Sequence, residues 1–232
     1  MHIELVDSLR CPHPHEDTWL VASVTRFEGR DIVEGSLGCP VCRRQYAVRE
    51  GEVDFTVSVA PGGDALPPAA AAGTAARPGE TQQAAAFTLV PDEEVFLRAR
   101  ALLALGEPGG IVLLGGAHAR NADAFEDEVQ VTTLLLNAPA GLRPSGRYPS
   151  AMRATDTVPV AGGGLRGAWL DRDTATPAIM AAAARALRRG GRLVAPVEVM
   201  LPAGVRELAR DRSEWVAEGE GGMSAPVAIR RR

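Results

Sequence analysis

All three cysteines of this 232-residue chain lie before residue 43, and two histidines follow the first of them closely. Cys11 is followed by His13 and His15, and the other two cysteines form the pair Cys39 and Cys42. A closed tetrahedral zinc site takes four such ligands, commonly as two short-range pairs. One pair is Cys39 with Cys42, and the other is Cys11 with a histidine. We favour His15, because a three-residue gap lets the loop wrap round an ion more easily than the one-residue gap to His13.

Other roles fit these residues less well. A redox Cys-x-x-Cys pair opens a helix after a strand, whereas residues 43–48 after Cys42 have a strand pattern. Inert thiols act as small hydrophobic side chains, and that role does not explain why all three cysteines lie before residue 43. A catalytic zinc ion keeps one position open, but a fourth protein ligand is available here. The sequence therefore predicts a structural zinc ion bound by the three cysteines and His15, with His13 as the alternative.

The residues around the ligands predict short antiparallel strands. Strand-forming residues occupy 19–25 and 31–37, with turns at 28–30 and 50–51. This pattern predicts a zinc ribbon over residues 1–59. A module of this length buries only a small core, so we expect the metal to supply much of its folding free energy, on the order of 10 kcal/mol in small zinc modules.

Three stretches of this module match a known pattern. They are Leu5 to Pro12 with its Cys-Pro end, Cys39-Pro-Val-Cys42, and the hairpin sequence at residues 46–54. Together they resemble the zinc-ribbon family of methyltransferase activator subunits, although a histidine replaces the second cysteine of the first pair. The resemblance covers about a quarter of the chain. It implies a structural zinc ion and a module that docks on a methyltransferase, without chemistry of its own.

Composition limits the function classes. The net charge of −4 disfavours nucleic acid as a partner, although arginine clusters such as Arg43-Arg44 leave a local contact open. The chain has no lysine, which excludes Schiff-base and P-loop lysine chemistry. No stretch is apolar and long enough to span a membrane, and Glu4 and Asp7 lie where a signal peptide would be basic. We expect a cytoplasmic protein.

Residues 60–86 are rich in Pro, Gly and Ala and predict a linker to a second domain over 87–232. In that domain we expect helices at 91–105 and 176–189, the second ended by Gly190-Gly191. We expect buried strands at 111–114, 131–137, 165–171 and 192–196, and a closing hairpin that pairs 214–217 with 226–229. This alternation predicts an α/β fold, a compact Rossmann-like domain of three layers with a parallel sheet.

Two motifs of the second domain resemble class I methyltransferases, which bind S-adenosylmethionine. They are the stretch from Asp156 to Asp171 and the Gly190-Gly191 turn with its flanking leucines. The resemblance spans about 140 residues. It implies that the cofactor-binding residues are Gly115, Gly116 and Ala117 after the first strand, Asn137 after the second, and Asp156.

The sequence departs from this family at the cofactor. Leu113 replaces the acidic residue of the first strand, Ala117 and Ala119 replace glycines, and Asn137 replaces the acid that holds the ribose. Alanine adds methyl groups where the cofactor meets backbone, and asparagine lacks the charge that strengthens such hydrogen bonds. We therefore predict that S-adenosylmethionine binds weakly or not at all.

Three functions compete. The first is a zinc-binding protein whose methyltransferase-like domain has lost its cofactor and acts in binding or scaffolding, with the ribbon docked on it within the chain and a possible protein partner. The alternative is an active S-adenosylmethionine-dependent methyltransferase with a divergent cofactor loop. The third is another ligand activity at the carboxyl ends of the strands, near Gly115, Asn137 and Asp171. His118, beside the first of these, is a weaker candidate for a base.

Overall fold

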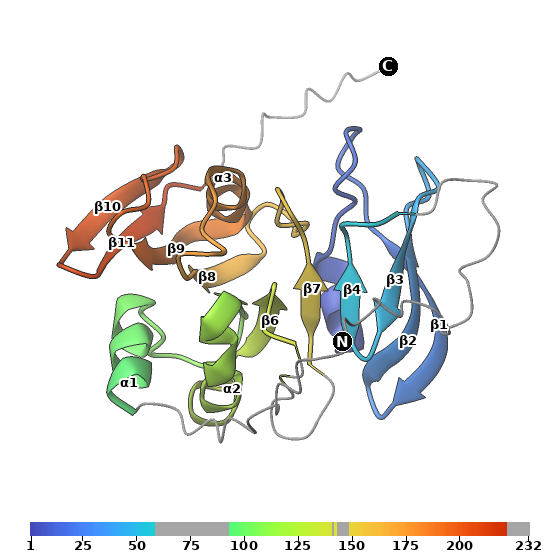
Figure 1. Cartoon of the computed structure of the whole chain (residues 1–232), viewed down its shortest axis with the longest axis horizontal. Coiled ribbons are helices and arrows are strands. Elements are labelled where there is room, and N and C mark those ends of the chain that lie inside the picture. Colours follow the sequence, from blue (N-terminus) through green and yellow to red (C-terminus); the bar gives the residue numbers. More distant parts are fainter. Residues whose placement is uncertain (59–92, 141, 143–148, 222–232) are drawn as a thin grey trace, which may run out of the picture.

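The computed structural model describes residues 1–58, 93–140, 142 and 149–221. The eleven strands of this part form one mixed sheet in the order β1-β2-β3-β4-β7-β6-β5-β8-β9-β11-β10 (Figure 1). The predicted linker at 60–86 and the predicted strand at 226–229 lie outside the described residues. No helix in the described ranges is both long enough and apolar enough to cross a membrane.

The N-terminal elements form an antiparallel meander. They are the 3-10 helix η1 (Ile3–Ser8) and the strands β1 (Val21–Glu28), β2 (Asp31–Gly38), β3 (Gln45–Arg49) and β4 (Glu52–Asp54). The strands expected at 19–25 and 31–37 are confirmed as β1 and β2. The turn between β3 and β4 has positive φ angles at Glu50 (50°) and Gly51 (79°), as tight hairpins require.

The remaining elements form the α/β part of the sheet. They are α1 (Glu93–Leu102), β5 (Ile111–Gly115), η2 (Gly116–Asn121), α2 (Ala122–Val129), β6 (Thr132–Leu136), β7 (Ala151–Arg153), β8 (Leu165–Trp169), α3 (Pro177–Ala186), β9 (Leu187–Pro196), β10 (Val205–Arg210) and β11 (Glu214–Gly219). The strands β7, β6, β5, β8 and β9 run parallel. β11 runs antiparallel between β9 and β10.

Helices cover both faces of this sheet, because its apolar strands alternate their side chains between two cores. On one face, Leu113 belongs to the cluster that contains Ile179 of α3. On the other face, Leu114 belongs to the cluster that contains Phe96 of α1 and Phe125 of α2. Figure 1 shows α3 on one side of the sheet and α1 and α2 on the other. The expected three layers are present.

The meander and the α/β part share the sheet through β4 and β7. These strands pair in parallel, with Val53 opposite Met152 and a 2.5 Å ion pair between Glu52 and Arg153. A second contact lies after η1, where the N–H of Arg10 donates to the carbonyl of Pro159 at 2.9 Å. One apolar cluster extends through both parts. The N-terminal strands are therefore an extension of the α/β sheet.

Two expectations for the end of the chain are wrong. The second helix ends at Ala186 rather than 189, because Leu187 has extended backbone and pairs with Leu165. The next pair joins Gly167 to Arg192, so residues 188–191 form a bulge that includes the two glycines. The strand expected at 214–217 is β11, which pairs with β10 on one side and with β9 on the other, so both of its edges are taken by described strands. β10 has five exposed positions out of six, so no strand alternation marks it.

Candidate metal centre and glycine turn

The four predicted zinc ligands lie together. Cys11 and His15 come from the loop after η1, and Cys39 and Cys42 come from the turn between β2 and β3. Their ligand atoms all lie within 4.8 Å of one another. Cys39 is buried and the other three residues are partly buried. The cluster therefore joins the N-terminal loop to the β2–β3 turn.

Local backbone geometry shapes this turn. The N–H of Arg43 donates to the carbonyl of Cys39 at 2.8 Å, and the N–H of Cys39 donates to the carbonyl of Arg44 at 2.9 Å. Arg43 has a φ of 58°, in the left-handed region that reverses the chain. The backbone N–H groups of Cys42 and Val41 donate to the sulfur of Cys39. The turn therefore presents both cysteine sulfurs toward the N-terminal loop.

Two of the distances between ligand atoms are close to those in a tetrahedral zinc site. The Sγ atoms of Cys11 and Cys42 are 3.7 Å apart, and Sγ of Cys39 is 3.3 Å from Nε2 of His15. With zinc–sulfur bonds of about 2.3 Å and zinc–nitrogen bonds of about 2.0 Å, a tetrahedron separates two sulfurs by about 3.8 Å and sulfur from nitrogen by about 3.5 Å. Three thiolates and an imidazole are also the ligands that zinc prefers.

The two candidate histidines, His13 and His15, differ in their other contacts. Nδ1 of His15 is 2.6 Å from the carbonyl of Glu16, to which it donates, so Nε2 presents its lone pair to the cysteines. His13 contributes its backbone N–H to the sulfur of Cys11 instead. His13 also lines a neighbouring cavity. This geometry favours His15 as the fourth ligand.

The environment of the thiols differs across the cluster. Burial raises the pKa of Cys11 to about 11, and the hydroxyl of Tyr46 lies 3.6 Å from its sulfur. Burial also disfavours the Cys39 thiolate, but the backbone N–H groups of Cys42 and Val41 lower the pKa of Cys39 to about 7. A cation at the cluster would favour the thiolate form of each cysteine.

The glycine turn, defined as Gly115, Gly116 and Ala117, follows β5, the strand at which the strand order of the sheet reverses. From β5 the chain goes to β6 on one side, while β8 lies on the other side. In open α/β sheets, ligands bind outside the carboxyl ends of the strands at such a point. Here the N–H of Ala117 donates to Oδ2 of Asp171, which follows β8, at 2.7 Å.

The two glycines are packed against the segment after β8. A Cβ atom at Gly115 would lie 2.6 Å from Cδ2 of Leu170 and 2.9 Å from Cγ2 of Thr174. A Cβ atom at Gly116 would lie 2.5 Å from Cγ of Asp171. Gly116 also has a φ of 57°, which favours glycine. Both glycines are therefore required by contacts within the protein.

His118 directly follows the glycine turn, in η2, and stacks on Trp169. The ring centroids are 3.6 Å apart and the planes differ by 12°. Burial lowers the pKa of His118 to about 4, although the carboxylates of Asp171 and Glu214 act in the opposite direction. The imidazole is therefore neutral at pH 7 and forms part of the packing between η2 and β8.

Asn137 follows β6, beside the glycine turn, and both polar atoms of its amide form a hydrogen bond within the protein. Its Nδ2 donates to the carbonyl of Ala154 at 2.8 Å, and its Oδ1 accepts from the N–H of Ala154 at 3.0 Å. Asn137 has a φ of 51°, a conformation that asparagine adopts more readily than most residues. The side chain thus joins the ends of β6 and β7.

Asp156 lies apart from these groups. It is exposed and lines a cavity of about 300 Å³ together with His13, Arg44 and Tyr46, next to the cysteine cluster. The structure therefore brings the glycine turn and Asn137 to neighbouring strand ends, as expected, but places Asp156 at the junction with the meander. The sequence predicts only that Asp171 lies near the expected site. In the structure its side chain contacts the glycine turn.

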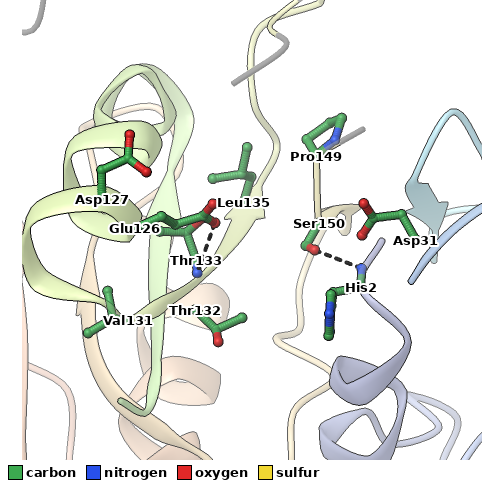
Figure 2. Close-up of a pocket in the computed structure, with 10 residues that line it drawn as sticks. All are labelled: His2, Asp31, Glu126, Asp127, Val131, Thr132, Thr133, Leu135, Pro149 and Ser150. Atoms are coloured by element: carbon green, nitrogen blue, oxygen red, sulfur yellow. Dashed lines mark hydrogen bonds between the residues drawn. The ribbon is translucent and has the colours of Figure 1, made fainter. Parts of the chain in front are cut away.

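Another cavity, of about 270 Å³, lies at the amino end of β6 and contains none of the predicted site residues. Figure 2 shows His2 and Asp31 on one side of it and Glu126 and Asp127 of α2 on the other. The N–H of His2 donates to Oγ of Ser150 at 2.9 Å. This cavity is at the amino ends of the strands, whereas the glycine turn is at their carboxyl ends.

Comparisons with known proteins give only distant likenesses. No family model matches the chain, and no curated protein sequence matches it. Among solved structures it resembles geranyl diphosphate C-methyltransferase from Streptomyces coelicolor A3(2), with 16% identity, a TM-score of 0.34, and coverage of 43% of this chain and 42% of that one. The chain therefore spans less than half the length of that enzyme.

Two further structures are similar to the same degree. One is the antibiotic-resistance methyltransferase Kmr, with 15% identity, a TM-score of 0.37, and coverage of 57% of this chain and 95% of that one. The other is a complex of the Haloferax volcanii Trm112 methyltransferase activator with a protein described as a methyltransferase. A chain of that complex matches with 13% identity, a TM-score of 0.36, and coverage of 50% of this chain and 70% of that one.

Proposed function

We propose that this chain is a zinc-binding protein in which a zinc ribbon is docked on a methyltransferase-like domain that has lost cofactor binding and acts in binding or scaffolding. The strand order supports the methyltransferase-like domain. Around β5 it has the arrangement of a doubly wound sheet, in which β7, β6, β5, β8 and β9 stand in the order 3-2-1-4-5. The antiparallel hairpin of β10 and β11 completes the sheet.

One observation carries the loss of cofactor binding: both polar atoms of the Asn137 amide are bonded to the backbone of Ala154. The family resemblance gives this position to the group that holds the cofactor ribose. Releasing the amide leaves a buried N–H and carbonyl without partners, at a cost of about 1–3 kcal/mol for each. These bonds support the proposal that the residues present do not fit S-adenosylmethionine.

The four-residue cluster supports a structural role for zinc. Four protein ligands leave no open position for a substrate or water, so the ion would stabilise the ribbon rather than catalyse a reaction. It would hold the N-terminal loop against the β2–β3 turn, and β4 would then present its edge to β7. On this proposal the ribbon docks on the methyltransferase-like domain within one chain.

Metal analysis tests the zinc assignment. The purified protein should contain about one zinc ion per chain after expression in zinc-replete medium, since a complete Cys₃His set binds zinc strongly at neutral pH. His15→Ala should lose most of this zinc, while His13→Ala, the matched control, should keep it. A zinc-free wild-type protein would contradict the metal site. Zinc loss in His13→Ala but not in His15→Ala would show that the fourth ligand is misassigned.

Titration of S-adenosylmethionine into the zinc-loaded protein tests the proposed loss of cofactor binding. The account predicts no binding at micromolar concentrations. Micromolar binding would instead favour an active methyltransferase with a divergent cofactor loop.

A further inference from the structure

The carboxylate of Asp171 lies against the glycine turn in the position where an open α/β sheet receives its ligand. We propose that the glycine turn is a carboxylate-binding cradle and that Asp171 is its resident occupant, an internal ligand that closes the site. This inference rests on the proposed function and deepens it, because it names the group that takes the cofactor's place.

Hydrogen bonds from two different elements hold this carboxylate. Oδ2 accepts from the N–H of Ala117 in η2 at 2.7 Å, and Oδ1 accepts from the N–H of Thr174 before α3 at 3.0 Å. Each carboxylate oxygen therefore has a backbone donor. Within the glycine turn it is the N–H of Ala117 that donates to this carboxylate, and it follows the positive φ of Gly116, a backbone geometry found in anion-binding turns. These bonds and the Thr174 hydroxyl outweigh burial and lower the pKa of Asp171.

The shape of the turn matches this occupant. A Cβ at residue 116 would overlap the carboxylate of Asp171, and a Cβ at residue 115 would overlap Leu170 and Thr174. Glycine turns in nucleotide-binding sheets leave such space for a phosphate or a cofactor. In this chain the same space is taken by residues 170–174. The glycines are thus explained by an internal partner without any bound ligand.

A second contact fixes the turn on the same strand. His118 stacks on Trp169, the last residue of β8, two positions before Asp171. η2 is therefore attached to the end of β8 both by a ring stack and by a charged hydrogen bond. Because the ring stack does not involve the carboxylate, it should keep η2 in place when Asp171 is replaced.

Hydrogen-exchange NMR on the full zinc-loaded chain tests the cradle. In Asp171→Ala the amide of Ala117 should exchange about ten- to a hundredfold faster than in the wild type, relative to the amide of Leu114 in β5, because a charge-assisted bond is lost. Asp171→Asn, which keeps the shape, should show a smaller increase. Asp173→Ala removes an exposed neighbouring carboxylate and should leave Ala117 unchanged.

Formate then serves as a probe for the empty cradle. It should slow the exchange of Ala117 in Asp171→Ala and raise the melting temperature of that variant, while chloride at equal ionic strength and formate added to the wild type should do neither. Unchanged exchange of Ala117 in both Asp171 variants, or equal effects of formate on wild type and Asp171→Ala, would overturn the proposal. Cofactor binding to the wild type with Ala117 still protected by Asp171 would contradict the proposed function and leave the cradle in place.

Discussion

At the scale of single residues, His118 shows how the surroundings of a side chain decide its role. A histidine beside a glycine turn is a candidate base in the sequence, yet His118 is partly buried against Trp169 and its pKa is lowered to about 4. The groups around it oppose one another: Asp171 and Glu214 favour its protonated form and Arg120 disfavours it. Burial exceeds them all, so His118 is a packing residue with a neutral ring.

This burial predicts a pH dependence of stability. The unfolded chain protonates His118 near pH 6.5, whereas the folded chain does so only near pH 4, so the unfolded state binds more protons between these values. Stability should therefore fall as pH decreases from about 6.5 to 4. His118→Phe keeps a ring on Trp169 and removes the titration. Over this range the wild type should lose about 3 kcal/mol more unfolding free energy than the variant.

Denaturant unfolding of both proteins at several pH values measures this difference. Acid-induced changes at the cysteine–histidine cluster do not confound it, because the cluster is the same in both proteins. Parallel pH profiles of the wild type and His118→Phe would show that His118 is accessible to protons in the folded state.

At the scale of elements, the join between the two parts depends on two strands of three residues each. β4 lies between β3 and β7, with Val53 opposite Val48 on one side and Met152 on the other. Both Val53 and Met152 are fully buried. Strands this short are not stable alone and persist because neighbours on both sides supply hydrogen bonds and an apolar face. The pairing of β4 with β7 should therefore stabilise both parts.

A proline in β4 should separate them. Val53→Pro removes a donor in the middle of the sheet and should lower the unfolding free energy by about 3 kcal/mol or more. The matched control is Val21→Pro at the first residue of the edge strand β1, where the cost should stay below about 1 kcal/mol. Hydrogen exchange in β6 should also accelerate in Val53→Pro, since its neighbour β7 loses support. Unchanged exchange in β6 would show that the α/β part does not depend on β4.

At the scale of the whole molecule, the sequence predicts those sites and strands that are marked by a pattern of neighbouring residues. The proposed zinc ligands lie in two short-range groups, and the buried parallel strands appear as apolar runs, so the sequence alone indicates both. β7 could not, because Ala151–Arg153 has no pattern of its own and becomes a strand by pairing with β4 and β6.

The sequence also does not predict the side-chain contacts at the glycine turn and at Asn137. Asn137 lies at the end of a strand, as the sequence predicts, but its bonds to Ala154 depend on how the chain returns to β7. Asp171 lies 54 residues from Ala117, and its carboxylate reaches the turn only because β8 is next to β5. Side chains that meet across a sheet leave no periodic signal along the chain.

The central claim is that the protein's own side chains occupy the position at the carboxyl ends of β5, β6 and β8 where a methyltransferase would hold its cofactor. Isothermal titration of S-adenosylmethionine and S-adenosylhomocysteine into the full zinc-loaded chain tests it most directly. The account predicts no saturable heat for either compound, with any dissociation constant weaker than about 1 mM. A micromolar dissociation constant with one site per chain would contradict it.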